Sequence, residues 1–506
     1  MTAALTAPSA SADLGYTNSP VDLTMADGTI LKGILTKPTT PGPHPGIVMP
    51  ASWGLPNFEY LAQAHELARD GYVVVSYNER GFWGSEGCVN GGTAEDISDV
   101  SDVVDWMIDN AQADPGMIGA AGMSNGGGLS LLGAAHDPRI KAVVAMSSWQ
   151  DEAASLFPNG TKAKQSVGVL MALAQAVGDP CPELVEGANS PTLTPALQAA
   201  YAAASPQTYV DRYNANGTAI LLSKNLQDSV FPPNQDVTFY NSLTTPKKLL
   251  MQPGDHLTGE FPGLTGLPNV PWDKARDWFD RYLRGIDNGA DQEAPVQVKE
   301  NASISYAGYS TTAAMSRTTK TYGMSKDFFG GRLGEIKQGW SWQIQSGAAD
   351  TCAGAGTVLI SGTLTQFLNW PPGCAVGLTN PQHSAFWQSG IFTETTHIRG
   401  APTVRLNFGQ NGGKGSLFLY LYDVGPTGTL GQLITYMPYS YNFAPNSWRN
   451  VTIPLRTAAY DIPPGHRVGL VIDTKDPMFY DTNVSGSSVT FTSPLSSPST
   501  VTLPIE

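Results

Sequence analysis

The segment Gly122-Met123-Ser124-Asn125-Gly126 places a serine between two glycines, a pattern suited to nucleophilic chemistry. An apolar run at 117–121 precedes it and a glycine-rich apolar run at 127–132 follows, which predicts a strand, a sharp turn and a helix. Such a turn strains the backbone of the serine and needs glycine where neighbouring backbone comes close. The helix N-terminus beside the serine stabilises a developing oxyanion. Chance produces such a motif easily in a chain with 54 glycines, but the context favours Ser124 as a nucleophile.

A serine nucleophile needs a general base, which is most often histidine. In the α/β-hydrolase fold the catalytic residues follow the chain order serine, acid, histidine. Six of the seven histidines do not fit, because they precede the serine, end the helix that it begins, or lie in a β-rich C-terminal region: His44, His65, His136, His383, His397 and His466. His256 remains, in a loop after a strand predicted at 248–252; the alternative is a loop histidine at a domain interface. A histidine base predicts activity that falls below a pH of about 6.5.

The third catalytic residue, an acid, should lie in the loop after the strand that comes before the strand leading to His256. Asp228 occupies that loop, after an apolar strand predicted at 219–222. We expect it to hold the imidazole tautomer and to stabilise the imidazolium. Two carboxylates compete with it: Asp236, which is predicted to lie in the next helix, and Asp255, which is too close to His256 along the chain to reach its Nδ1 comfortably.

The composition limits the classes of protein that this chain can belong to. Its 506 residues require two or three domains, and 41% hydrophobic with 14% charged residues indicates a well-folded globular protein. A net charge of −14 argues against nucleic acid or anionic membranes as partners. No apolar run reaches about eighteen residues, so we expect no membrane span. The expected partner is a small-molecule or peptide acyl substrate.

The four cysteines divide two and two between the halves of the chain. None lies in a CxxC pattern or beside histidines at metal spacing, so we expect no metal site and no cofactor. We predict the disulfides Cys88–Cys181 and Cys352–Cys374 and a secreted protein; the alternative is four buried thiols. Residues 1–19 are predicted to be disordered, and Ala10-Ser11-Ala12 resembles the end of a signal peptide, although an ordinary N-terminus has the same character.

Strand and helix patterns alternate through the first half of the chain. A hairpin at 21–37 leads into short apolar strands at 46–49, 72–77, 117–121 and 140–145, with helices at 58–70 and from Thr93 between them. This order predicts an α/β class fold with a doubly wound parallel sheet, formed by residues 20–150 and 215–290 and ending in a helix at 272–283. The Ala-rich segment 151–214 is predicted to form a helical cap over the site.

Residues 291–506 are rich in Thr, Ser, Gly, Val and Tyr, with turn signals every eight to twelve residues. This pattern predicts an all-β jelly-roll sandwich, joined to the first domain by the short junction 284–295. Its early part carries more large aromatic residues than its own core needs, and we expect some of them to pack against the hydrolase core or to line the substrate entrance: Trp340, Trp342, Phe367, Trp370 and Trp387. The alternative is that they form the core of the sandwich or an exposed surface.

The combined features resemble the X-Pro dipeptidyl-peptidase and cocaine-esterase family of serine hydrolases. The resemblance rests on the elbow at Ser124 and on four segments: Asn78–Gly87, which is similar to the family pattern D-x-R-G-x-G-x-S-x-G, 228–232, 254–256 and 278–285. It covers about residues 20–506 and implies a Ser-Asp-His hydrolase core, a cap and a C-terminal jelly roll.

Two positions depart from the family pattern. Many members carry tyrosine after the elbow serine, where this chain has Asn125, and the esterases place an oxyanion tyrosine where Pro50 is followed here by Ala51-Ser52-Trp53. We therefore expect an oxyanion hole formed by the backbone N–H of Asn125 and by one near Ser52, with help from the Ser52 hydroxyl. The guanidinium of Arg80 is expected to tie loops together.

These features predict a secreted serine hydrolase that cleaves an ester or amide through an acyl-enzyme. An X-Pro-type dipeptidyl-peptidase and an acyltransferase would use the same triad, and a non-catalytic glycan-binding protein is the remaining alternative. A dipeptidyl-peptidase needs carboxylates for the substrate ammonium, for which Asp151 and Glu152 are candidates, while Trp53 is a further candidate for substrate contact. The chain is shorter than the X-Pro peptidases, which favours an esterase or amidase.

Overall fold

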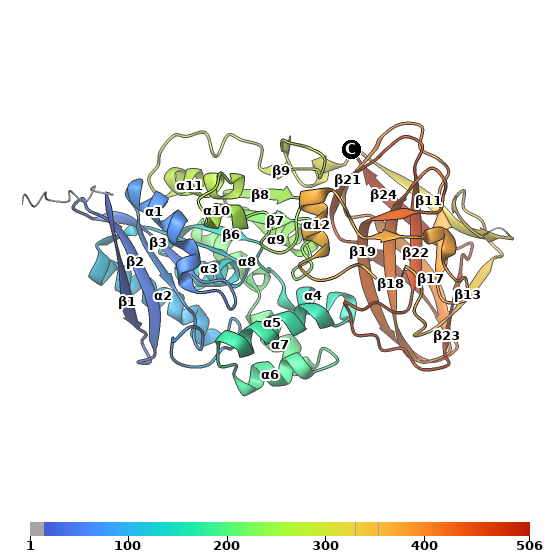
Figure 1. The fold of residues 1–506 in the computed structure, drawn as a ribbon, viewed down its shortest axis with the longest axis horizontal. Coiled ribbons are helices and arrows are strands. Elements are labelled where there is room, and N and C mark those ends of the chain that lie inside the picture. Colours follow the sequence, from blue (N-terminus) through green and yellow to red (C-terminus); the bar gives the residue numbers. More distant parts are fainter. Residues whose placement is uncertain (1–14, 329, 353) are drawn as a thin grey trace, which may run out of the picture.

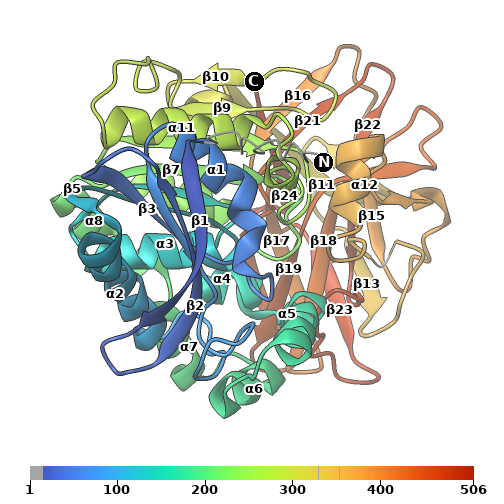
Figure 2. The ribbon, with the colours of Figure 1, turned by 60° about the vertical axis from the view of Figure 1, so that its left-hand side comes forward.

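The computed structural model describes residues 15–328, 330–352 and 354–506. Figure 1 shows an α/β part, coloured blue to green, beside a β part, coloured orange to red. The hairpin of the first two strands lies at the end of the α/β part farthest from the β part (Figure 1), and Figure 2 brings this hairpin to the front. The expected fold class, an α/β-hydrolase core followed by an all-β domain, is confirmed.

The first sheet contains ten strands within residues 15–328, in the order β1-β2-β4-β3-β5-β6-β7-β8-β9-β10. Strands β3 to β9 are parallel to one another, whereas β1, β2 and β10 pair in antiparallel fashion with their neighbours. The sheet continues past residue 291, where the sequence places the start of the β domain. It also begins earlier than expected, because residues 16–19, which the sequence predicts to be disordered, pair with β2; the rest of that prediction, residues 1–14, lies outside the described residues. The strands are β1 Tyr16–Thr24, β2 Ile30–Pro38, β3 His44–Pro50, β4 Val73–Tyr77, β5 Ala113–Met123, β6 Ile140–Met146, β7 Ala219–Asn225, β8 Lys247–Gln252, β9 Val296–Val298 and β10 Ala307–Tyr309.

Helices cover both faces of this sheet, as expected for strands that are apolar on both sides. One face packs against α1 and α11, and the other against α2, α3, α8 and α9. The helix expected from Thr93 is α2, and Thr93 and Asp96 form a capping box at its start. The bounds are η1 Asn57–Tyr60, α1 Leu61–Arg69, α2 Ala94–Ala111, α3 Asn125–His136, α8 Val210–Asn216, α9 Asn234–Ser242, α10 Phe261–Leu264 and α11 Val270–Tyr282.

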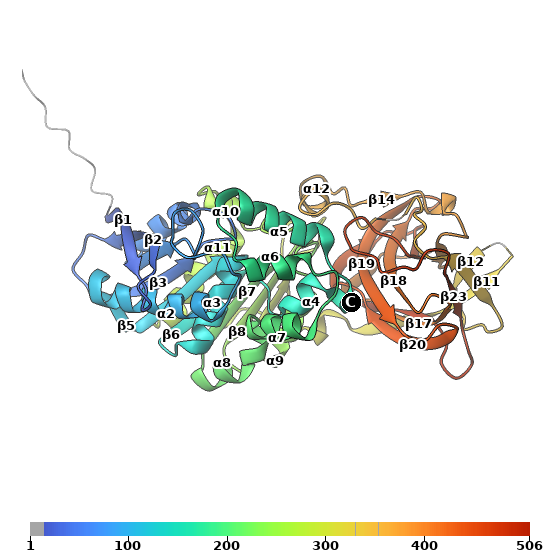
Figure 3. The same cartoon turned by 90° about the horizontal axis from the view of Figure 1, so that it is seen from below.

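Short helices between β6 and β7 form a cap on one side of the sheet. Figure 3 shows α5, α6 and α7 gathered in front of the sheet, beside the β domain. Their apolar residues point into a cavity between the cap and the helices α2 and α3. The cap elements are α4 Glu152–Leu156, η2 Pro158–Gly160, α5 Lys164–Val177, α6 Pro182–Asn189, α7 Pro195–Ala203 and η3 Pro206–Tyr209.

Both predicted disulfides are confirmed: Cys88–Cys181 and Cys352–Cys374, with Cα atoms 5.2 and 5.3 Å apart. The first joins the loop after β4 to the N-cap of α6. Backbone hydrogen bonds support the same junction, because the N–H of Cys181 donates to Val89 O and the N–H of Val89 donates to Asp179 O, both at 2.8 Å. The bridge therefore fixes one wall of the cavity.

We expect the double variant Cys88→Ser/Cys181→Ser to lose about 2–5 kcal/mol of unfolding free energy, because the bridge closes a long loop. It should also raise KM, because the cap loses its covalent tie to the cavity wall. Cys352→Ser/Cys374→Ser is the matched control, with lower stability and little change in KM. Urea unfolding and KM for one ester substrate measure both effects; equal KM in the two variants would contradict the role of the first bridge.

The β domain is a sandwich with its own apolar core. In the described part of the chain its strands follow the order β13-β23-β17-β24-β11-β12-β15-β22-β18-β19-β14, with β16 and β21 paired and β20 on β17. The elements are η4 Ala313–Met315, β11 Thr318–Asp327, β12 Gly330–Gly334, β13 Ser341–Gln345, α12 Ser361–Leu368, β14 Gly373–Cys374, η5 Val376–Leu378, β15 Ala385–Gln388, β16 Thr396–Gly400, β17 Thr403–Gln410, β18 Lys414–Val424, β19 Gly431–Asn442, β20 Ser447–Pro454, β21 Ala458–Ile462, β22 Arg467–Asp473, β23 Ser488–Thr492 and β24 Thr500–Ile505.

The expectation for the large aromatic residues of this domain is wrong. Trp340 and Trp342 pack around Trp387, at ring-centroid distances of 6.1 and 5.1 Å, within the sandwich core. Phe367 and Trp370 are each 63% exposed. The three tryptophans stabilise the sandwich itself, because they are its largest apolar groups and its core accommodates them.

Within the described ranges, no helix combines the length and apolar character needed to cross a bilayer. The same residues contain no group of three or more His, Cys, Asp or Glu side chains arranged to hold a metal ion.

Candidate active site

The elbow at Ser124 has the strained geometry expected from its sequence. Ser124 lies between β5 and α3 with φ 51° and ψ −118°. A Cβ added to Gly122 would lie 2.4 Å from the carbonyl carbon of Gly126, and one added to Gly126 would lie 2.0 Å from Pro50 O. Both glycines are therefore required by close backbone approach, and they keep tight the turn that presents Ser124 to the cavity between the cap and the helices α2 and α3.

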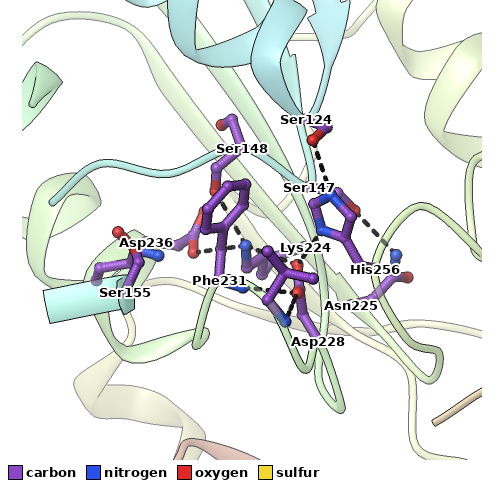
Figure 4. A network of polar contacts seen from close by, with 12 residues as sticks. Ser124, Ser147, Ser148, Ser155, Lys224, Asn225, Asp228, Phe231, Asp236 and His256 are labelled. Carbon is purple, nitrogen blue, oxygen red and sulfur yellow. Dashed lines mark hydrogen bonds and ion pairs between the residues drawn. The ribbon is translucent and has the colours of Figure 1, made fainter. Parts of the chain in front are cut away.

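The loops after β7 and β8 bring the predicted acid and base to this serine. Ser124 Oγ lies 2.8 Å from His256 Nε2, and His256 Nδ1 lies 3.1 Å from Asp228 Oδ2. Figure 4 shows the three side chains in line, with the imidazole between the hydroxyl and the carboxylate. The ring of Phe231 meets the imidazole edge to face, at 5.1 Å between centroids, and limits its rotation. This arrangement can pass a proton from Ser124 to His256.

Asp228 is fully buried and keeps its charge through its contacts. Its Oδ1 accepts hydrogen bonds from the backbone N–H groups of Val230 and Phe231, at 2.9 and 2.8 Å. Lys224 Nζ lies 3.0 Å from Oδ2. Burial opposes ionisation, but the charges of Lys224 and His256 outweigh it and hold the pKa of Asp228 well below its usual range.

The two competing carboxylates lie elsewhere. Asp236 belongs to α9 and lies 3.5 Å from Lys224 Nζ. Asp255 Oδ1 accepts from the backbone N–H groups of Ser229 and His256, both at 2.8 Å, so it joins the two loops that carry Asp228 and His256. Neither carboxylate contacts the imidazole.

The backbone N–H and the hydroxyl of Ser52 are both engaged in other contacts, so the second oxyanion donor that we expect near Ser52 is not Ser52 itself. The backbone N–H of Ser52 donates to Glu59 Oε1 at 2.6 Å, and its hydroxyl donates to Met123 O at 3.2 Å. Burial raises the pKa of Glu59 to about 7, and the bond from Ser52 opposes this shift. The backbone N–H of Asn125 lies at the first position of α3, where no intrahelical acceptor exists. Trp53, the residue after Ser52, lines the same cavity as Ser124 and Asn125.

A cavity of about 670 Å³ opens onto Ser124. Its walls come from the loop 90–94, from α2, and from the cap helices α4 to α7, and they are mainly apolar and small side chains. Trp53 lines it as expected, held by a bond from Nε1 to Leu170 O at 2.8 Å. Glu152 also lines it, and burial, with Asp151 nearby, raises the pKa of Glu152 well above its usual range. Asp151 instead caps α4 by accepting from Ala154 N at 2.9 Å, so its expected role in substrate binding is not supported.

Arg80 is structural, as expected. It forms a bidentate pair with Asp99, at 2.7 and 2.6 Å, and reaches Asp27 in the turn of the first hairpin at 2.7 Å. Ser124, His256 and Asp228 form a relay of contacts, and two residues near this relay were not identified from the sequence: Lys224 and Glu59. For Lys224 a signal exists, because a lysine follows closely on the apolar run 219–222, four residues before the acid.

Two family models match consecutive parts of this chain. The family model "X-Pro dipeptidyl-peptidase (S15 family)" matches residues 27–258, and "X-Pro dipeptidyl-peptidase C-terminal non-catalytic domain" matches residues 288–502. A polyketide transferase of a Penicillium species is 29% identical to this chain over 135 residues. The aligned region covers 26% of this chain and 44% of that protein. A Bacillus anthracis protein named "Putative Xaa-Pro dipeptidyl-peptidase" is 24% identical to this chain over 268 residues. The aligned region covers 45% of this chain and 41% of that protein. The chain thus aligns with less than half the length of either curated relative.

The fold has close counterparts among solved structures. A CocE/NonD family hydrolase of Staphylococcus aureus superposes with a TM-score of 0.74 over 97% of this chain and 96% of that one, at 11% sequence identity. An identity this low supports the fold alone. The two family models lie in the expected order over most of the chain, and the chain belongs to the X-Pro dipeptidyl-peptidase (S15) family of serine hydrolases.

Proposed function

We propose that this protein cleaves an ester or amide bond through an acyl-enzyme. Ser124 attacks the carbonyl carbon, His256 accepts the serine proton and returns it to the leaving group, and Asp228 holds the imidazole and balances the imidazolium charge. The backbone N–H groups of Asn125 and Trp53 bind the oxyanion. The observation that carries this proposal is the continuous contact from Ser124 Oγ through His256 to Asp228 at the base of a cavity.

The cavity supports a substrate with a bulky apolar group. Leu156, Val167, Leu170, Met171 and Leu184 face it, and glycines and alanines of the loop 90–94 and of α7 leave the space open. Apolar surface that enters such a cavity gains about 25 cal/mol per Å² from water exclusion. Long acyl or alcohol groups should therefore raise kcat/KM relative to acetyl esters.

Fluorophosphonate labelling with peptide mapping, followed by a p-nitrophenyl ester series from acetate to octanoate, tests both proposals. The expected results are a single adduct on Ser124 and kcat/KM that rises with acyl length. Absence of an adduct would contradict the acyl-enzyme, whereas a preference for acetate would contradict only the apolar substrate. Addition of an alcohol acceptor, with analysis of products, separates hydrolysis from acyl transfer; the Penicillium relative is named a polyketide transferase.

A second candidate is cleavage of substrates with a free α-ammonium group, as in dipeptidyl-peptidases. The observation that favours it is Glu152, a carboxyl group that faces a mainly apolar cavity. A bound ammonium would favour the ionised form of this carboxyl, and a charged hydrogen bond of this kind contributes about 1.5–3 kcal/mol.

We expect Glu152→Gln to lower kcat/KM for Ala-Pro and Gly-Pro anilides by about 10–100-fold, and to change it little for neutral p-nitrophenyl esters. Asp151→Asn is the matched control, because it changes the adjacent carboxylate, which caps α4. Equal effects of Glu152→Gln on charged and neutral substrates would contradict ammonium recognition.

We also propose that the protein works in an oxidising compartment. The two disulfides support this location, because such bonds are rare in reducing cytosol. Four alkylatable cysteines in protein isolated from its natural source, denatured without a reducing agent, would contradict this location.

A further inference from the structure

Lys224 is a charged side chain in the interior of the first sheet. It lies in β7, four residues before Asp228, and its exposed fraction is 0%. A buried ammonium group loses its hydration, and a protein retains one only where other groups compensate the loss. The contacts of Lys224 show which groups compensate its lost hydration.

Its ammonium group contacts the acid of the relay directly. Lys224 Nζ lies 3.0 Å from Asp228 Oδ2, the same oxygen that lies 3.1 Å from His256 Nδ1. Figure 4 shows Lys224 beside Asp228, with the imidazole on the other side of the carboxylate. Ammonium and imidazole therefore share one carboxylate oxygen, while two backbone N–H groups hold the other.

Two further oxygens fix the ammonium in this place. Lys224 Nζ donates to Ser148 O at 3.0 Å and lies 3.5 Å from Asp236 Oδ2, and the ring of Phe231 lies 5.7 Å from it. Burial raises the pKa of Asp236 to about 7, although the charge of Lys224 opposes this shift. Asp236 and the carbonyl of Ser148 therefore hold the ammonium beside Asp228.

Other charged groups face the relay from neighbouring elements, and each is held by other partners. Asp255 bonds to backbone N–H groups of its own and the preceding loop, and to Gly362 N at 3.1 Å. Glu260 accepts from Ser147, Ser223 and Asn225. Arg456 donates to the backbone carbonyl of Asp228 at 2.8 Å. In the described part of the chain, Lys224 is the one lysine or arginine in an ion pair with the Asp228 carboxylate, which otherwise contacts the imidazole of His256.

We propose that Lys224 is a positioning residue of the relay, which fixes the Asp228 carboxylate and lowers the proton affinity of His256, so that the base stays neutral at lower pH. This inference rests on the proposed role of His256 as the base. Asp228 alone favours the imidazolium, whereas a second cation on the same carboxylate disfavours it. Removal of the ammonium should therefore favour the imidazolium and make activity require a higher pH.

The pH dependence of kcat/KM for a neutral p-nitrophenyl ester tests the proposal. Lys224→Met should move the acidic limb upward by about one pH unit or more, because a unit charge several ångströms away is weakly screened in the interior. The loss should be about tenfold at pH 5.5 and much smaller at pH 8.5. A general packing defect would lower the rate equally at both pH values.

Two controls separate the charge from the loss of a buried lysine. Lys248→Met removes the buried lysine of the adjacent strand β8, whose ammonium contacts Glu293 and Ala290 O, and should leave the limb in place. Asp236→Asn keeps the ammonium beside Asp228 and should not raise the limb. If Lys224→Met does not fold, the double variant Lys224→Met/Asp236→Asn, which removes opposite charges together, should fold and carry the measurement.

An acidic limb that stays in place in folded Lys224→Met would overturn the proposal. An equal upward shift of the acidic limb in Lys248→Met would also overturn it. Failure of the proposed function has a different signature, since the wild-type protein would then lack Ser124-dependent esterase activity at every pH.

Discussion

Ser124→Ala is expected to lower kcat by roughly 10⁴-fold or more, because loss of the nucleophile abolishes the acyl-enzyme. The fold should remain intact, since alanine fits the space of serine and Ser124 Oγ contacts His256 alone among the described side chains. Turnover of a p-nitrophenyl ester measures the effect, and far-UV circular dichroism with thermal unfolding checks the fold.

Ser130→Ala provides the matched control. Ser130 is a buried serine of α3 whose hydroxyl donates to Gly126 O at 2.7 Å, away from the imidazole. Its replacement removes one buried hydroxyl and should leave activity within about tenfold of wild type, given the usual value of about 1 kcal/mol for one hydrogen bond. Retention of a tenth of the activity in Ser124→Ala would rule out Ser124 as the nucleophile.

A fragment of residues 1–290 is expected to lose nearly all activity or to be insoluble. The β domain contacts the loops that carry the relay: Arg456 donates to Asp228 O at 2.8 Å, Gly362 N donates to Asp255 Oδ2 at 3.1 Å, and Leu359 N donates to Ser229 Oγ at 3.0 Å. One apolar cluster also runs from the hydrolase core into the β domain. Without these contacts the loops are free to shift, and a shift of about 1 Å costs roughly 10²-fold in rate.

Two further samples make this experiment decisive. A fragment of residues 1–310 keeps β9 and β10 in the first sheet, so it tests loss of the sandwich without loss of edge strands. Arg456→Met in the full chain removes one contact to the acid loop while the sandwich remains. A soluble, monomeric fragment with full activity toward the best ester would show that the β domain is an independent accessory.

Local patterns in the sequence predicted much of the α/β part. The hairpin at 21–37, the helix that starts at Thr93 and the elbow at Ser124 depend on neighbours within a few residues, so propensity and spacing suffice to identify them. Chain order then selected His256 and Asp228, and the structure brings these two side chains to Ser124. Even cysteine counts in each half predicted the two disulfides correctly.

Contacts between distant segments were decided only by the tertiary structure. Glu59, in η1, accepts a hydrogen bond from the backbone N–H of Ser52, and nothing near Ser52 in the sequence indicates this contact. Asp151 and Glu152 are adjacent and chemically similar, yet the direction of α4 makes the first a helix cap and aims the second into the cavity.

The sequence by itself determined the class of fold, the order of the two domains and the residues able to form a Ser-His-Asp relay, because these follow from periodicity, glycine placement and chain order. Only the tertiary structure decided which side chains surround that relay. Lys224, Ser148 and Asp236 come from three elements that meet at one end of the sheet. Their effect on Asp228 depends on distances of a few ångströms in a buried, weakly screened site, which no local pattern encodes.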